Sequence, residues 1–286
     1  MKRITYLVAA LAIAIASCKK NDPEPAASKT ASTTDSASVI AEAKKKASGS
    51  STSTTSGSSS GSTSTTTTSS SATLLATIAK VAVYKEGTAF YYTTGMTIDA
   101  DGAYKAYNAN DAIALDYLSD GGVPGDWWAL ATDQNGNPIV QGPNDPAPGY
   151  YVSMTALADE TLPGSDPYSY VDAASIPYIV LPPNLEKDGG AKLGDFVVVY
   201  NAANSKLSYA IFADEGPNDH LGEGSIALAN NLSINSSAKT GGADNGITYV
   251  VFPGSGNGKK RTAAEIATNG QALFTAWGGL SKLNIK

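Results

Sequence analysis

Short runs of apolar and β-branched residues recur from about residue 73 onward, and clusters of Gly, Pro, Asn and Asp separate them. Runs of this length between turn residues are typical of β-strands rather than of helices. The expected strands cover 79–84, 90–93, 127–131, 139–140, 150–154, 178–180, 196–200, 207–212 and 248–252. The pattern therefore predicts a mostly β domain.

Two kinds of local signal add detail to this pattern. The runs 196–200 and 207–212 flank an Asn-rich turn and predict a β-hairpin. Ser225 can cap a short helix over 226–232, and Thr262 begins the capping-box sequence Thr-Ala-Ala-Glu of a second helix. We expect small helices added to a β core.

The first residues of the chain have the pattern of an export signal. Lys2 and Arg3 precede the apolar stretch 4–16, which is too short to cross a bilayer and ends in small residues. Cys18, the only cysteine, follows directly, so residues 1–17 resemble the signal peptide of a bacterial lipoprotein, with Cys18 as the acylated first residue. An ordinary signal peptide followed by a chance cysteine is the alternative.

A polar segment separates the signal from the domain. Residues 18–72 contain few large apolar side chains, and 48–71 consist only of Ser, Thr and Gly. Such a composition cannot bury enough surface to offset its ordering entropy. The sequence predicts a disordered tether over 18–72 and one domain over 73–286. An exported lipoprotein on the outer membrane or cell surface is the expected location.

The predicted domain is acidic. Residues 73–286 carry 12 basic and 22 acidic side chains, a net charge of −10. This charge repels nucleic acid and anionic lipid and attracts cationic ligands. Taken by itself, the charge is better explained by the solubility of an exported protein, so it does not identify a ligand.

Two carboxylates stand at the ends of expected elements. Asp214 follows the strand 207–212, and Glu223 precedes the helix that Ser225 caps. Hydrolysis of a glycosidic bond requires such a pair, because one carboxyl group protonates the leaving oxygen and the other activates water or attacks the sugar. An aspartate and a glutamate nine residues apart are common, so the spacing alone does not establish catalysis.

The sequence around this pair resembles a known family. Residues 212–229 contain Asp-x-Gly-Pro followed by Gly-Glu-x-Ser, which is similar to the signature of the chitosanases of glycoside hydrolase family 75. Further matches are Met-Thr-Ile-Asp-Ala-Asp-Gly at 96–102, Ile-Pro-Tyr-Ile-Val-Leu-Pro at 176–182 and Gly-Asp-Phe at 194–196. The resemblance covers most of the domain.

The resemblance implies an endo-acting, inverting hydrolase of the β-1,4 bonds of chitosan, with Asp214 and Glu223 both needed. Inversion implies carboxyl groups about 6.5–9.5 Å apart. Burial after a strand favours Asp214 as the acid. The chain departs from the fungal pattern at Ala213 and Glu215 and lacks the fungal cysteines, which leaves the contacts with substrate less defined than the pair.

Further residues are candidates for binding the cationic polymer. Asp99 and Asp101 can bind substrate amines or assist the attacking water, or they can simply form a turn. Other candidates are the loop acids Glu215 and Asp219 and the sugar-stacking residues Trp127 and Trp128, although solvated loop acids and core aromatics are common. No metal site or cofactor is indicated, and a monomer is expected.

The strand, the Asp-x-Gly-Pro loop and the small helix also resemble a double-psi β-barrel with six strands. That likeness leaves a second enzymatic hypothesis, a glycanase or lytic enzyme that acts on peptidoglycan. A lipid-anchored polysaccharide-binding protein without turnover is a third, because a fold does not guarantee an activity. Both enzymatic hypotheses require the two carboxylates to face one open cleft, whereas a binding protein does not.

Overall fold

The computed structural model describes residues 72–283. The predicted signal peptide at 1–17, the lipidation site Cys18 and the tether up to residue 71 lie outside the described residues. Within 72–283, no helix combines the length and the apolar composition that a membrane span requires.

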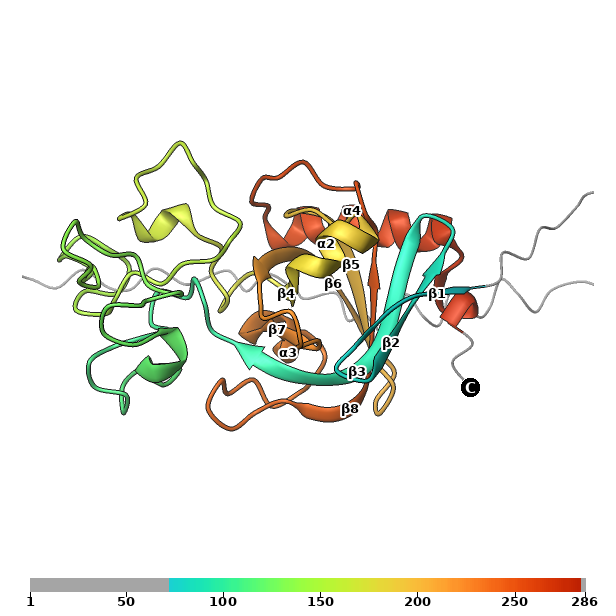
Figure 1. Cartoon of the computed structure of the whole chain (residues 1–286), viewed down its shortest axis with the longest axis horizontal. Coiled ribbons are helices and arrows are strands. Elements are labelled where there is room, and N and C mark those ends of the chain that lie inside the picture. The colour runs from blue at the N-terminus through green and yellow to red at the C-terminus, as the bar shows by residue number, and fades with distance from the viewer. Residues whose placement is uncertain (1–71, 284–286) are drawn as a thin grey trace, which may run out of the picture. The chain divides into compact units, whose positions relative to one another are not determined.

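Six strands close into a barrel (Figure 1). In order round the barrel they are β3 (Ala89–Asp99), β7 (Glu223–Ser225), β4 (Tyr178–Leu181), β6 (Lys206–Glu215), β5 (Phe196–Asn201) and β8 (Ala243–Val251), and β8 pairs with β3. The pairs β3–β7 and β4–β6 are parallel and the others are antiparallel, so the barrel is mixed. The prediction of a mostly β domain with a six-stranded barrel core is confirmed.

Two further strands extend the sheet. β1 (Thr73–Ile78) and β2 (Val81–Glu86) form a hairpin, and β2 pairs with the first part of β3. The sequence predicted a strand at 79–84 only, because the turn residues Ala79 and Lys80 carry no glycine or proline signal although both have positive φ.

The helices are short and capped as expected. α3 (Ile226–Asn231) begins at Ser225, whose Oγ accepts from the Leu228 N–H at 3.1 Å. α4 (Ala263–Trp277) begins with the predicted capping box of Thr262 and Glu265. α2 (Pro183–Gly189) was not predicted, and three 3₁₀ turns complete the helical elements of the described residues, at Leu118–Gly121, Pro167–Ser169 and Gly279–Leu283.

Alternation along the strands divides the apolar residues between two faces. Val199 on β5 and Tyr249 on β8 belong to the cluster inside the barrel. Their neighbours along the strands, Val198 and Val250, face outward and pack near Phe274 of α4. Because β5 is buried on both faces, its sequence is an apolar run rather than an alternating one.

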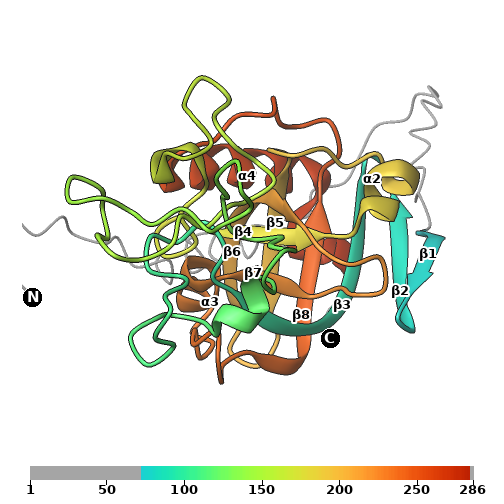
Figure 2. The same cartoon turned by 60° about the vertical axis from the view of Figure 1, so that its left-hand side comes forward.

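Residues 100–177, here called the covering segment, connect β3 to β4 with little regular structure and lie over β4, β6 and β7 (Figure 2). The strands predicted at 127–131, 139–140 and 150–154 are wrong, because these residues form only isolated bridges. Their apolar side chains serve packing instead: Leu130, for example, lies in a cluster with Tyr178 of β4.

Two lysines outside the covering segment hold it in place. Lys239 Nζ donates to the Ala114 carbonyl oxygen at 2.8 Å, and Lys260 Nζ donates to that of Tyr170 at 3.1 Å. These contacts give an irregular segment a defined position over the barrel strands.

Candidate active site

Asp214 and Glu223 lie on the two strands that flank β4. Val180 of β4 pairs with Asp214 on β6 and also with Glu223 on β7. Residues paired across a sheet point to the same face, and two strand spacings of about 4.8 Å place the Cα atoms of the two acids about 10 Å apart. The pair therefore shares one level and one face of the barrel wall.

A β-bulge on β6 turns Asp214 toward this face. Ile179 pairs with Phe212 and Val180 pairs with Asp214, so Ala213 is an extra residue in the strand. In a regular ladder Asp214 would point into the barrel, where Phe212 lies. The bulge instead places its carboxylate beneath the covering segment, where the Leu157 N–H also binds the Ala213 carbonyl oxygen at 2.9 Å.

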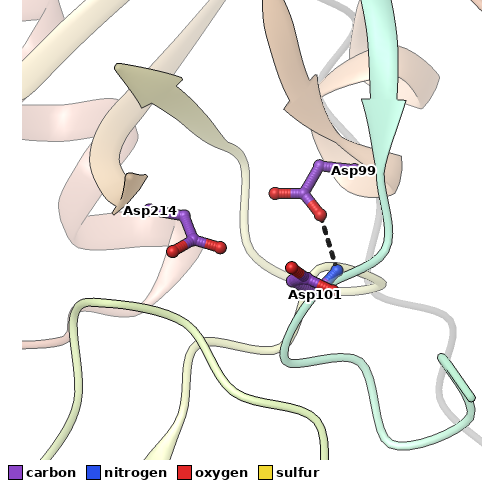
Figure 3. A group of neighbouring side chains, drawn as sticks. All are labelled: Asp99, Asp101 and Asp214. Carbon is purple, nitrogen blue, oxygen red and sulfur yellow. Dashed lines mark hydrogen bonds between the residues drawn. The ribbon is translucent and has the colours of Figure 1, made fainter. Parts of the chain in front are cut away.

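Asp99 and Asp101 meet Asp214 at this face. Asp99 ends β3, Asp101 follows in the next turn and Asp214 lies near the end of β6, and their carboxylates point toward a common space (Figure 3). One oxygen from each lies within 4.8 Å of the others. Three oxygens at this separation can bind an ammonium group or a metal ion. The prediction that no metal is needed stays a prediction.

The sequence Asp-Ala-Asp-Gly forms the turn that was one of its two interpretations, and the binding of substrate amines by Asp99 and Asp101 stays a prediction. The Asp101 N–H donates to Asp99 Oδ1 at 2.7 Å, which is the turn bond expected of an aspartate at this position. Gly102 follows with a φ of +76°, and a Cβ there would lie 2.1 Å from the Val171 carbonyl oxygen. The turn thus places Asp101 beside Asp214 as well as satisfying its own backbone.

Neighbouring donors hold the aspartates in place. Asp214 Oδ1 accepts from the Ala156 N–H at 2.8 Å and from the Glu215 N–H at 2.9 Å. Tyr107 donates its hydroxyl to Asp101 Oδ1 at 2.6 Å, and Tyr178 donates its hydroxyl to the Asp101 carbonyl oxygen at 2.8 Å. These bonds come from both the covering segment and the barrel, so the cluster depends on their packing together.

Burial raises the pKa of four acids on this face, Asp99, Asp101, Asp214 and Glu223. Desolvation is the main cause in each case, and it raises the pKa of Asp99 to about 6 and that of Glu223 to about 8. The pKa values of Asp101 and Asp214 are also well above the ordinary range, because burial is reinforced by the charge of Asp99. Acids with this perturbation in one place are typical of a functional site.

One further acid, Asp116, belongs to the neighbourhood, and sequence reasoning missed it. Its side chain is buried in the covering segment, and burial raises its pKa to about 6. Its N–H donates to the Ala106 carbonyl oxygen at 3.0 Å, next to the Tyr107 that binds Asp101. Asp116 also helps to raise the pKa of Glu223. It stands in an irregular segment without a motif, so the sequence contained no signal for it.

The other predicted binding residues lie in less enclosed positions. Glu215 and Asp219 are exposed, and Glu215 lies close enough to Glu186 of α2 to raise the pKa of that residue. Trp127 packs partly against the apolar cluster beneath the covering segment. Trp128 is 58% exposed, and its Nε1 donates to the Asp120 carbonyl oxygen at 2.9 Å, which fixes the ring at the surface.

The barrel presents two carboxylates on one face, with further acids beside them. A pair of carboxylates is what glycoside hydrolases use for catalysis. A family model described as fungal chitosanase of glycosyl hydrolase group 75 matches residues 96–277, well over half of the chain. The chain belongs to this family of glycoside hydrolases. The match includes all the acids described above. No curated protein matches the chain.

Proposed function

We propose that the protein is an endo-acting chitosanase that hydrolyses β-1,4 glucosaminidic bonds with inversion, using Asp214 and Glu223. The supporting observation is that both residues lie opposite Val180, on one face and about two strand spacings apart. An inverting hydrolase needs room for a water molecule between the carboxylate base and the sugar, and so needs widely spaced carboxyl groups. Membership of the chitosanase family supports chitosan as the substrate.

Asp214 is the proposed base. The two main-chain N–H groups on its Oδ1 stabilise the carboxylate form. Asp214 accepts a proton from water as the water oxygen bonds to the anomeric carbon, and the bond from that carbon to the leaving oxygen breaks. The sequence favoured Asp214 as the acid because of its burial, but burial raises the pKa of both partners and does not distinguish them.

Glu223 is the proposed acid. Among the described residues, no hydrogen-bond donor contacts its carboxyl group, so nothing there favours the ionised form. With a pKa of about 8, it holds its proton at neutral pH. It gives that proton to the leaving oxygen and is reprotonated from water after the product leaves.

Asp99 and Asp101 are proposed to bind the ammonium group of the sugar whose bond is cleaved. Their charges lie beside Asp214 and face a common space. A cation there relieves the repulsion between the three carboxylates and lowers their pKa values. N-acetylation removes the cation, so this role predicts a preference for deacetylated units.

One experiment tests the activity. Residues 73–286 are incubated with chitosan, chitin and peptidoglycan, and new reducing ends are measured. Release from chitosan alone supports the proposal, release from peptidoglycan supports the lytic alternative, and binding without release supports a polysaccharide-binding protein. An anomeric NMR time course on a soluble oligomer tests inversion, since the α-anomer must appear first.

We also propose that the protein is an exported lipoprotein anchored through Cys18, displayed at the outer membrane or cell surface. The apolar stretch 4–16 and the small residues before Cys18 support this location. Cys18→Ser should abolish labelling with a radioactive fatty acid and release the protein from the membrane fraction. Unchanged labelling of that variant contradicts the anchor.

A further inference from the structure

A pocket of about 270 Å³ is lined by Gly222, which precedes Glu223, and by residues 94–97 of β3, which precede Asp99. It is formed by β3, the loop before β7 and the start of β8, and its lining includes Thr97, His220, Gly222 and Asp244. Three segments far apart in the sequence therefore build it. None of its polar side chains has a role in the two-carboxylate mechanism.

The register of the strands fixes the position of the pocket relative to catalysis. Thr97 pairs with Glu223, and the Thr97 N–H donates to the Gly222 carbonyl oxygen at 2.8 Å. Asp99 lies two residues further along β3, which is about 6.6 Å, and pairs with Ser225. Glu223 thus lies level with Thr97 at one end of the pocket, and the acidic cluster begins at Asp99, further along β3.

Glycines allow the pocket to form. A Cβ at Gly95 would lie 2.5 Å from the Ala243 carbonyl oxygen, and one at Gly222 would lie 2.7 Å from the Gly95 carbonyl oxygen. Since real Cβ atoms do not come so close to backbone, only glycine lets these chain segments touch. The hollow above them is a built feature of the fold.

The lining has the groups that bind an amino sugar. Thr97 Oγ1 and His220 Nε2 lie 3.3 Å apart and both can bind hydroxyl groups. Asp244 is exposed, and in the part of the chain that the structure describes its carboxylate has neither an ion pair nor a hydrogen-bond donor. It is available to a cation.

We infer that this pocket is a subsite for the glucosamine unit on the leaving-group side of the bond, with Asp244 pairing with its ammonium group and Thr97 and His220 binding its hydroxyls. This inference rests on the proposed function. Glu223, as the acid, must touch the leaving oxygen, so the unit that carries this oxygen lies beside Glu223. The acidic cluster begins at Asp99, further along β3 than the pocket, which leaves the pocket for the leaving unit.

The test uses Asp244→Asn and His220→Ala, with Asp188→Asn as a control, because Asp188 is an exposed aspartate on α2. A soluble glucosamine hexamer is cleaved in ¹⁸O-water, and mass spectrometry locates the labelled reducing ends. We expect Asp244→Asn to raise KM roughly two- to fivefold with kcat changed less than about twofold, the size of an exposed charge contact. We also expect the preferred cleavage site to shift toward one chain end, and Asp244→Glu to recover part of the affinity.

An unchanged KM and cleavage pattern in both pocket variants, with thermal unfolding like that of the unmodified protein, overturns the subsite. Failure of the proposed function looks different, because the unmodified protein then releases no reducing ends from the hexamer. In that case, calorimetric titration of the same hexamer into the unmodified protein and into Asp244→Asn measures the contribution of the subsite to the binding affinity. Equal affinities overturn it.

Discussion

Asp214 and Glu223 lie opposite the same residue, Val180, on strands that run on either side of β4. The relationship depends on the bulge at Ala213, which brings Asp214 to the face that Glu223 occupies. The two acids are nine positions apart in the sequence, but the sheet determines their spacing. A rigid wall of three strands holds them more firmly than the loop 216–222 does.

Removing either carboxylate should abolish most of the activity. Asp214→Asn and Glu223→Gln keep the shape of the side chain but cannot exchange the proton, and general acid or base catalysis contributes roughly 10²- to 10⁴-fold. We expect kcat on a glucosamine hexamer to fall by about this factor, with Asp188→Asn unchanged as a control. Full activity in either variant with a normal circular dichroism spectrum contradicts its role.

Leaving-group chemistry separates the roles of the two acids. An aryl glucosaminide with a good leaving group needs little protonation, so Glu223→Gln should keep a larger fraction of its activity on that substrate than on the hexamer. Asp214→Asn should lose a similar fraction of its activity on both substrates. The reverse pattern would make Asp214 the acid, as its burial suggested from the sequence.

The pH profile should show a fall in activity on the alkaline side. Glu223 must be protonated to act as the acid, and its pKa is about 8, so kcat/KM should decrease as the pH rises through about 8. On the acidic side the activity should fall where Asp214 becomes protonated, above the ordinary range of an aspartate. Soluble oligomers allow the measurement from pH 4 to 9.5. An alkaline limb that persists in the residual activity of Glu223→Gln on the aryl substrate contradicts this assignment.

The barrel was largely predictable because its strands are encoded locally. The run Val197-Val198-Val199 specifies a buried strand without reference to any partner, and Ser225 and Thr262 cap helices within one turn. β7 was missed because it has only three residues, and its Gly224 carries no strand signal. That strand exists because β3 and β4 pair with it on both sides.

The site was predictable only in part. The Asp214 and Glu223 motif could be located by its resemblance to a family, but nothing in the sequence contained the register that places both opposite Val180. Asp116 depends on the path of the covering segment, which has no periodic pattern. Long-range pairing brings these acids together, and sequence spacing does not record it.

Tyr107 should act as a positioning residue for Asp101. Its hydroxyl bond to Asp101 Oδ1, at 2.6 Å, is charge-assisted, and bonds of this kind contribute about 1.5–3 kcal/mol. Tyr107→Phe should raise the KM for the hexamer roughly tenfold or more and should weaken the preference for deacetylated over acetylated oligomers. The kcat should fall less.

A matched control for this substitution is Tyr170→Phe, which removes a hydroxyl bond to the Gly164 carbonyl oxygen, also in the covering segment. This control should leave KM and the acetylation preference unchanged. If Tyr107→Phe lowers the unfolding temperature but leaves both kinetic readouts unchanged, Tyr107 supports the fold only and does not position Asp101.

The acidic cluster should make the protein less stable as the pH rises. Glu223 titrates near 4.5 when unfolded and at about 8 when folded, so between these values the folded protein binds more protons. Stability from this group is therefore fully present below about pH 4.5 and is lost as the pH rises through about 8. Glu223→Gln removes the titration without removing a hydrogen bond that the described residues make. The substitution should raise the unfolding temperature at pH 8.5, by roughly 2–4 °C for each kcal/mol added to the free energy of unfolding, and leave it unchanged at pH 4.

Glu160→Gln is the control for this comparison, because Glu160 is exposed on the covering segment. It should shift the unfolding temperature little at either pH. An equal effect of Glu223→Gln at pH 4 and pH 8.5 would mean that its charge carries no cost in the folded protein. A stabilising effect confined to high pH would show that the ionised form of Glu223 destabilises the folded protein. The same burial keeps this carboxyl group protonated at neutral pH, where the proposed reaction requires an acid.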